Sequence, residues 1–192
     1  MNVHQMSVAY VPEQDRILAR VNTREAREIS FWLTRKLALG LAPLMDKVVS
    51  DHAARRGGLA PSHIAGMDEL ARKAISQFQS SATLKSADFA TPYKTPEAGV
   101  ALFEHPLLVT EVNVTALNND RLQLSFSEKL AASATQRSFQ LALSDQLVHA
   151  FVLLLERALV QSRWRDGPAA GAQAATAPGE RSTTPDKPGY LN

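Results

Sequence analysis

Apolar and polar residues alternate in three short stretches near the start of the chain. We predict a strand over 7–11, a turn, and a second strand over 15–21; Ile29, Phe31 and Leu33 mark a third. Alternation with a period of two is typical of a strand with one buried face. The pattern therefore predicts three consecutive strands that share an apolar face.

The same layout recurs in the second half of the chain. Strands are predicted over 108–115 and 120–126, separated by an Asn-Asn turn signal, and Phe139, Leu141 and Leu143 mark a third strand. Because a similar order of strands and turns appears twice, the sequence indicates an internal duplication.

A helical pattern follows each group of strands. Helices are predicted over 35–55 and 145–164, preceded by Thr34 and Ser144, whose hydroxyls are expected to cap the first turn. The apolar positions of the two helices coincide in pairs when the halves are aligned. These pairs are Leu37/Leu147, Leu41/Phe151, Leu44/Leu154, Met45/Leu155 and Val49/Leu159.

The predicted fold class is α+β. Two pseudo-repeated β-β-β-α units, about 7–56 and 107–164, would form one or two antiparallel sheets packed against two long helices. A pseudo-twofold axis would relate the units within a single domain over 1–165. The connector over 57–106 is expected to contain a short helix over 68–78, which begins with acidic residues.

The connector and the end of the chain differ in composition from the repeats. Phe89 and Tyr93 are the residues expected to pin the connector to the surface of the domain. From 166 to 192 the chain is rich in Ala, Gly, Pro and Thr. Such a segment buries too little apolar surface to offset its conformational entropy, so a disordered tail is predicted.

Composition restricts the class of protein. The chain has 192 residues, 45% hydrophobic and 21% charged, and a net charge of +2. No apolar run approaches the roughly 20 residues of a membrane span, so no membrane association is expected. The absence of cysteine excludes disulfides, thiolate zinc sites and a cysteine nucleophile. With no signal-peptide pattern at the start of the chain, a cytoplasmic location is expected.

No motif with known chemistry is found. The five histidines show no metal-ligand spacing, and the sequence contains no phosphate-binding glycine motif and no G-x-S-x-G elbow. We therefore predict no catalytic, cofactor-binding or metal-binding residues, no cofactor and no small-molecule substrate. The chain is expected not to be an enzyme.

The strongest candidate for a functional surface lies in the first unit. Alternation places Arg16, Leu18 and Arg20 on one face of the second strand, and Trp32 on the same face of the third. Arg and Trp are enriched in interaction hot spots. The alternative is that the second unit or the connector covers this face, which would make Trp32 a core residue. The equivalent face of the second unit is much less basic, with Gln123, Ser125, Gln136, Ser138, Gln140 and Ala142 in the corresponding positions.

Three stretches of the sequence resemble a family of uncharacterised proteobacterial proteins. The resemblance covers most of 7–164 and implies a bacterial cytosolic protein, but it supplies no catalytic residue. The stretches are Asp15-Arg16-Ile17-Leu18, Phe31-Trp32-Leu33-Thr34-Arg35-Lys36 and Ala87-Asp88-Phe89-Ala90-Thr91-Pro92-Tyr93.

Two functions fit these observations. The first is a non-enzymatic protein-interaction or adaptor module of the bacterial cytoplasm, with a separate protein partner or a second copy forming a homodimer. The alternative is a single-stranded nucleic-acid-binding protein that uses Arg16, Arg20 and Trp32 on a sheet face. The repeated strands and helix are similar in plan to the Whirly and Pur-type folds, although no residue motif of those families is matched.

Overall fold

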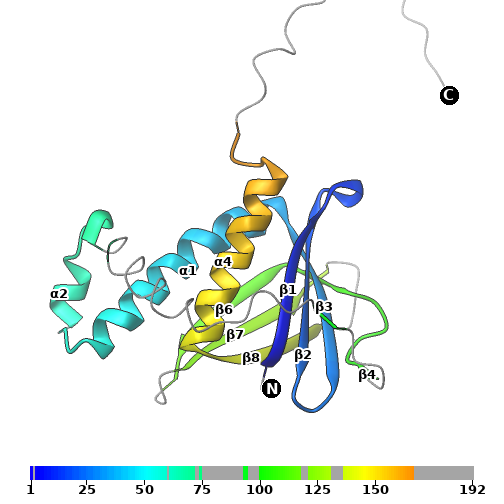
Figure 1. Cartoon of the computed structure of the whole chain (residues 1–192), viewed down its shortest axis with the longest axis horizontal. Helices are drawn as coiled ribbons and strands as arrows, with labels where there is room; N and C mark the ends of the chain where they lie inside the picture. The colour runs from blue at the N-terminus through cyan, green and yellow to red at the C-terminus, as the bar shows by residue number, and fades with distance from the viewer. Residues whose placement is uncertain are drawn as a thin grey trace, which may run out of the picture.

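The chain folds into a mixed α+β structure with two sheets and helices packed against them (Figure 1). The structure is a computed structural model. Its mixed α+β architecture is the predicted fold class. The model describes residues 1, 3–59, 61–71, 74, 93–94, 100–117, 121–130 and 136–166. The predicted tail over 166–192 lies outside the described residues from 167 onward, as does most of the predicted connector helix.

The first sheet begins as an antiparallel meander, as predicted. Its strands are β1 (Val3–Val11), β2 (Arg16–Thr23) and β3 (Arg27–Thr34), and a 3-10 turn, η1 (Pro12–Gln14), joins the first two. Ile17 pairs with Leu33, and Ala19 pairs with Phe31, on the buried face. The period-two pattern therefore assigned the inner face of this sheet correctly.

The prediction of purely antiparallel sheets is wrong for the far side of β3. Two short strands, β4 (Val100–Ala101) and β5 (Leu107–Val109), both pair with β3 in parallel. The chain leaves β3 through a long helix and a connector before it returns. A crossover of this length allows the strand to re-enter the sheet in the same direction.

The second sheet is a three-stranded antiparallel meander. It consists of β6 (Glu111–Ala116), β7 (Arg121–Glu128) and β8 (Arg137–Ser144), with β7 in the centre. Phe139, Leu141 and Leu143 pair with Phe126, Leu124 and Leu122 on its buried face. Residues 129–136 separate β7 from β8, a longer stretch than residues 24–26, which separate β2 from β3.

One stretch of chain belongs to both sheets. The predicted strand over 108–115 is divided at Thr110, with β5 in the first sheet and β6 in the second. The Thr110 N–H donates to the Ser127 carbonyl at 2.9 Å, and Glu111 is also paired with Ser127. Two residues opposite one make a β-bulge, which bends the strand from one sheet into the other.

Two long helices follow the two meanders. They are α1 (Arg35–Arg56), which contains Pro43, and α4 (Asp145–Ser162). The Thr34 hydroxyl accepts a hydrogen bond from the Leu37 N–H at 3.3 Å, as a capping residue does. The same prediction for Ser144 is wrong, because its side chain makes no capping hydrogen bond.

The connector begins with a short helix that the sequence did not predict, α2 (Pro61–Ala65). After it, Glu69, Leu70 and Ala71 are helical, at the start of the predicted range 68–78. The Asp68 carboxylate accepts from the Ala71 N–H at 2.7 Å, so an acidic residue caps this turn.

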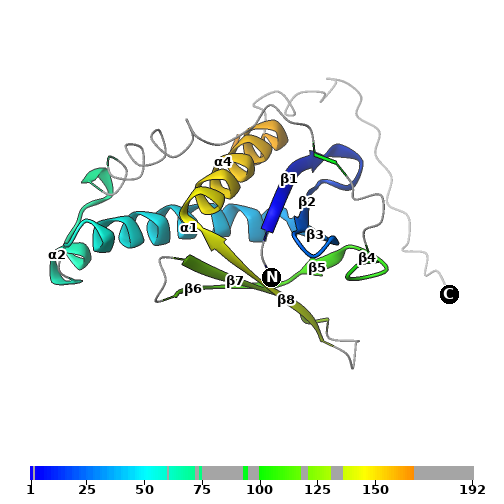
Figure 2. The same cartoon turned by 60° about the horizontal axis from the view of Figure 1, so that its bottom comes forward.

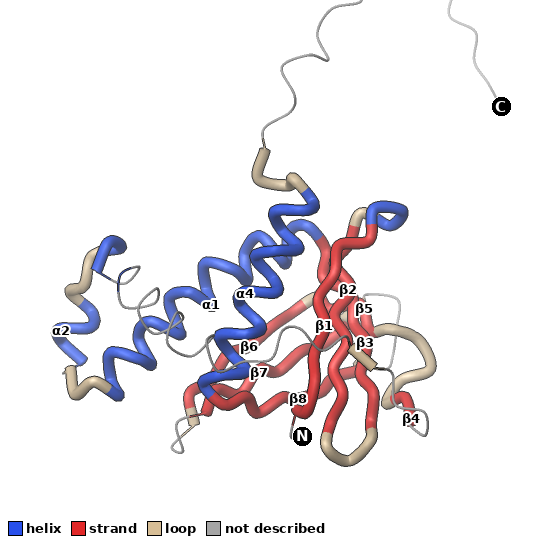
Figure 3. Tube along the Cα trace, viewed as in Figure 1, coloured by secondary structure: helices blue, strands red, loops and turns tan. Residues whose placement is uncertain are grey.

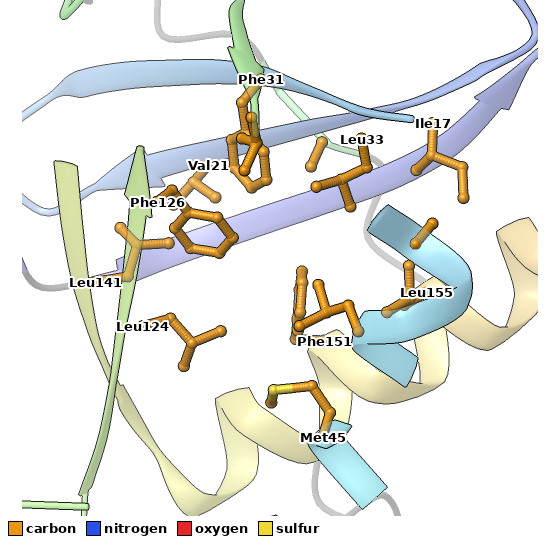
Figure 4. Packing of buried hydrophobic residues seen from close by; sticks show 14 of the residues in the cluster. Ile17, Val21, Phe31, Leu33, Met45, Leu124, Phe126, Leu141, Phe151 and Leu155 are labelled. Atoms are coloured by element: carbon orange, nitrogen blue, oxygen red, sulfur yellow. The ribbon is translucent and has the colours of Figure 1, made fainter. Parts of the chain in front are cut away.

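The core lies between the two sheets and the helices. Figure 2 shows α1 and α4 on one side of the β6–β7–β8 sheet, and Figure 3 shows the two sheets meeting at an angle. Phe31 of the first sheet packs against Phe126 and Phe139 of the second, with ring centroids 4.7 and 5.2 Å apart. Strand and helix side chains such as Phe126 and Met45 point into the same core (Figure 4).

Within the described part of the chain, no helix has the length and apolar character needed to cross a membrane.

Candidate interaction surface

The predicted surface residues share the outer face of the first sheet. On β2 the side chains of Ile17 and Ala19 are buried against the core. Arg16, Leu18 and Arg20 occupy the alternate positions and therefore point to the opposite side. Arg20 is exposed, whereas Arg16 and Leu18 are half-buried. Trp32 on β3 is half-buried as well, so it is neither a fully buried core residue nor a fully exposed one.

An apolar row runs straight across four strands of this face. Ala9 on β1 pairs with Leu18 on β2, and Leu18 pairs with Trp32 on β3. Trp32 in turn pairs with Leu108 on β5. We call Ala9, Leu18, Trp32 and Leu108 the outer apolar row. Side chains in direct register on one face lie about 5 Å apart, so these four form a continuous strip.

The outer apolar row has an arginine on each side. Arg16 lies in the neighbouring row, where it pairs with Val11 and Thr34. Arg20 lies in the row on the other side and pairs with Ser7 and Ser30. Both arginines are diagonal neighbours of Trp32, within reach of a long side chain.

The connector covers one end of the outer face. The Tyr93 hydroxyl donates to the Asn22 side chain at 2.7 Å and contacts the Glu28 carboxylate at 3.2 Å. The Asn22 amide donates to the Lys94 carbonyl at 2.7 Å, and Asn22 is buried as a result. Burial and the nearby Glu28 charge raise the pKa of Tyr93 above its ordinary value.

These contacts agree with the role expected of Tyr93 as a pin, while Phe89 lies outside the described residues. They also bear on the alternative interpretation, in which the connector or the second unit covers this face. The connector residues Tyr93 and Lys94 reach Asn22, Glu28 and Gln5, where the Lys94 N–H donates to the Gln5 side chain at 3.1 Å. In the described residues, the cover therefore lies beyond Arg20, away from the outer apolar row.

A second polar cluster, which the sequence did not predict, holds the end of α4 against the β1–β2 hairpin. The Asp15 carboxylate accepts hydrogen bonds from the Trp164 indole at 2.6 Å and from the Tyr10 hydroxyl at 2.9 Å. Arg35 donates to the Trp164 carbonyl at 2.9 Å. The two hydrogen bonds, that from Trp164 first, lower the pKa of Asp15, and the bond to Asp15 raises the pKa of Tyr10.

The outer face of the second sheet has a different character. Arg121, at the start of β7, is the one arginine on this face of the described strands β7 and β8. The positions after it on β7, and their partners on β8, are filled by small or uncharged polar side chains. These residues are Gln123, Ser125, Ser127, Ser138, Gln140 and Ala142. The two outer faces are therefore not equivalent binding surfaces.

The described residues contain no group of three or more His, Cys, Asp or Glu side chains arranged to hold a metal ion. Comparison with protein-family models, with curated proteins and with solved structures gave no match for this chain. The functional argument therefore rests on the geometry of the chain itself.

Proposed function

We propose that this chain is a non-enzymatic interaction module that captures a protein partner on the outer face of its first sheet. The observation that carries the proposal is the outer apolar row, a strip across four strands with Arg16 and Arg20 on its two sides. A large aromatic side chain with arginine neighbours is the residue combination enriched at binding hot spots.

The scaffold beneath this row supports the proposal. Phe31 and Leu33 flank Trp32 on β3 and are fully buried. Because their side chains fix the strand from the inner face, the position of Trp32 is set before a partner binds. Side chains held on a rigid sheet lose little conformational entropy on binding, which favours affinity.

The chemistry of the row also defines the partner. Leu18 and Trp32 would bury against an apolar patch, while Arg16 and Arg20 would each meet a carboxylate. We therefore expect a partner surface with an apolar centre and acidic residues on two opposite sides.

The experiment compares proteins captured by the immobilised full chain with those captured by two variants. Leu18→Asn combined with Trp32→Ala removes the centre of the row, and Gln140→Ala changes an exposed position of the second sheet as a matched control. We expect a set of partners retained by wild type and by Gln140→Ala and lost from the double variant. Thermal unfolding checks the fold of each variant.

Equal capture by all three chains would contradict the proposal. If the double variant does not fold, the charge reversal Arg16→Glu with Arg20→Glu tests the same face, because it leaves the apolar residues in place. Partner capture that survives this charge reversal would contradict the proposal.

Single-stranded nucleic acid is the second candidate, favoured by Trp32 with two arginines as diagonal neighbours. Fluorescence polarisation with labelled single-stranded DNA and RNA at low and moderate salt tests it. Binding tighter than about 1 µM that weakens steeply with salt would replace the protein-partner proposal. The net charge of +2 and the outer face of the second sheet, where Arg121 is the one arginine on the described strands β7 and β8, favour the protein partner.

We further propose that the two halves arose by duplication. In each half, three antiparallel strands lead directly into a long helix, β1–β2–β3 into α1 and β6–β7–β8 into α4. In both, the residue before the helix carries a hydroxyl, Thr34 or Ser144. On this interpretation the first copy has the more basic outer face, with Arg16 and Arg20 around Trp32, which assigns the interaction to that copy.

A further inference from the structure

A groove lies between α1 and the strand stretch that links the two sheets. Its volume is about 420 Å³, within the range of binding sites for ligands and peptide side chains. Most of the residues that line it are apolar. They are Thr34, Lys36, Leu37, Gly40, Leu41, Leu44, Leu108, Val109, Thr110 and Val112.

The helix wall of the groove is unusually open at one point. Leu37, Leu41 and Leu44 lie on one stripe of α1, and Leu44 is 42% exposed. Between them is Gly40, and a Cβ atom added there would meet no atom within 4 Å. Nothing in the described chain requires a glycine at this position by contact. A glycine in the wall of a groove leaves room for close approach of another backbone, because it has no side chain.

The strand wall offers an unpaired edge. β6 is an outer strand of its sheet, and among the described residues it pairs with β7 alone. The Leu117 N–H donates to the Arg121 carbonyl at 2.8 Å, immediately outside the Ala116–Leu122 pair. In an antiparallel ladder this marks Ala116–Leu122 as a pair without mutual hydrogen bonds, and every second pair is of the same kind.

Val114 and Val112 also belong to pairs without mutual hydrogen bonds, because they occupy alternate positions from Ala116 along β6. Their N–H and C=O groups point away from β7, toward the open edge of the sheet. Val112 is one of the residues that line the groove. A strand edge beside an apolar helix face is the geometry in which extended peptides add to a sheet.

We propose that this groove binds an extended peptide segment of a partner protein, which adds to the open edge of β6. Apolar side chains at alternate positions of the peptide would lie between the strand and the Leu37, Leu41 and Leu44 stripe. Lys36 carries the single charge among the described lining residues, so the peptide would place a carboxylate near it. This site goes beyond the outer apolar row, with which it shares Leu108.

The probe is a fluorescein-labelled nine-residue peptide of alternating valine and threonine with one central glutamate. We expect saturable binding to the full chain with a Kd below about 100 µM, measured by fluorescence polarisation. A peptide of the same sequence with N-methyl groups on alternate backbone nitrogens cannot pair with a strand edge, and it should bind at least tenfold more weakly.

Two substitutions at one residue separate filling of the groove from changes to the helix. Gly40→Leu places a side chain in the groove, whereas Gly40→Ala adds only the Cβ atom, for which there is space. Both favour the helix, so both should fold. We expect peptide binding to be at least tenfold weaker for Gly40→Leu than for Gly40→Ala. Equal affinities, or no binding of the peptide to wild type, would overturn the proposal.

Further measurements identify which polypeptide occupies the groove. A dimer of wild type that Gly40→Leu abolishes, seen by sedimentation, would assign the groove to a second copy and overturn the partner-peptide proposal. A tenfold gain in peptide affinity for Tyr190→Ser with Leu191→Ser would assign it to the chain's own C-terminal stretch, with the same consequence. The Leu18→Asn, Trp32→Ala variant should bind the peptide within twofold of wild type, which separates this site from the outer apolar row.

Discussion

At the scale of single residues, the two glycines at Gly40 and Gly58 are in opposite situations. Gly40 is inside α1 with open space around its missing side chain, whereas Gly58 has a φ of +82°, a conformation that favours glycine. We expect Gly40→Ala to raise the free energy of unfolding by about 0.5–1 kcal/mol, because alanine loses less backbone entropy in a helix.

Urea denaturation measures this change, and Gly58→Ala is the matched control. The same substitution at Gly58 should lower the free energy of unfolding by about 1 kcal/mol, because a Cβ atom strains the left-handed conformation. A loss of stability in Gly40→Ala would show that the helix is packed closely at that point and that the groove is not open there.

Side-chain direction was the part of the candidate surface that the sequence could predict. Period-two alternation placed Arg16, Leu18, Arg20 and Trp32 on one face, because a strand turns over at each residue. It could not predict that Leu108 would extend this face. That neighbour depends on a pairing between β3 and β5, and no local pattern encodes the contact.

At the scale of elements, a partly buried ion pair between Glu128 and Arg137 ties three strands together. Glu128 is 6% exposed at the end of β7, where it accepts the Leu108 N–H at 3.0 Å and pairs with Arg137 at 2.5 Å. The hydrogen bond from Arg137 is the main cause that holds the pKa of Glu128 below its ordinary value, and burial opposes it. The carboxylate therefore stabilises β5, β7 and β8 in its ionised form.

The stability that Glu128 contributes depends on pH, because the pKa of its carboxyl is lowered in the folded protein. A lowered pKa in the folded state gives stability that is present above the unfolded pKa, about 4.3, and is lost as the pH falls through the folded value. We expect Glu128→Gln to lower the free energy of unfolding by about 1–3 kcal/mol at pH 7. The difference from wild type should shrink as the pH falls below about 4 in urea titrations at a series of pH values. A difference that stays constant with pH would contradict the assignment.

The stretch over 108–115 shows why element boundaries were harder to predict than element types. Leu107 and Val109 are buried before Thr110, and Val112 and Val114 pack against the core after it. The bulge at Thr110 shifts the phase of alternation by one residue, so neither phase fits the whole stretch. A single strand was the simplest interpretation, although the chain uses the break to pass between sheets.

At the scale of the whole molecule, local patterns were sufficient for the two groups of strands and their helices but not for their assembly. Contacts such as the 2.6 Å hydrogen bond between Trp164 and Asp15 join residues at opposite ends of the described chain. Likewise, the parallel pairing of β3 with β5 depends on where the connector returns. Such contacts are set by the shape of the shared core, which a repeat in the sequence does not specify.

That shared core leads to a prediction about cooperativity. Phe126 stacks on Phe139 with ring centroids 4.9 Å apart and contacts Phe31 of the other sheet. We expect Phe126→Ala to lower the free energy of unfolding by about 3–5 kcal/mol, because it leaves a cavity between the sheets. Since both sheets line this cavity, β2 should lose protection together with β7.

Hydrogen exchange followed by mass spectrometry measures both strands in one experiment. In wild type, the slowest amides of β2 and β7 should exchange through the same opening, and Phe126→Ala should accelerate both to a similar degree. Acceleration confined to β7 would mean that each half folds on its own core. The rings of Phe31 and Phe126, 4.7 Å apart, would then be an interface between two domains. Because Phe31, Phe126 and Phe139 are all buried and in mutual contact, we expect the two halves to unfold as one unit.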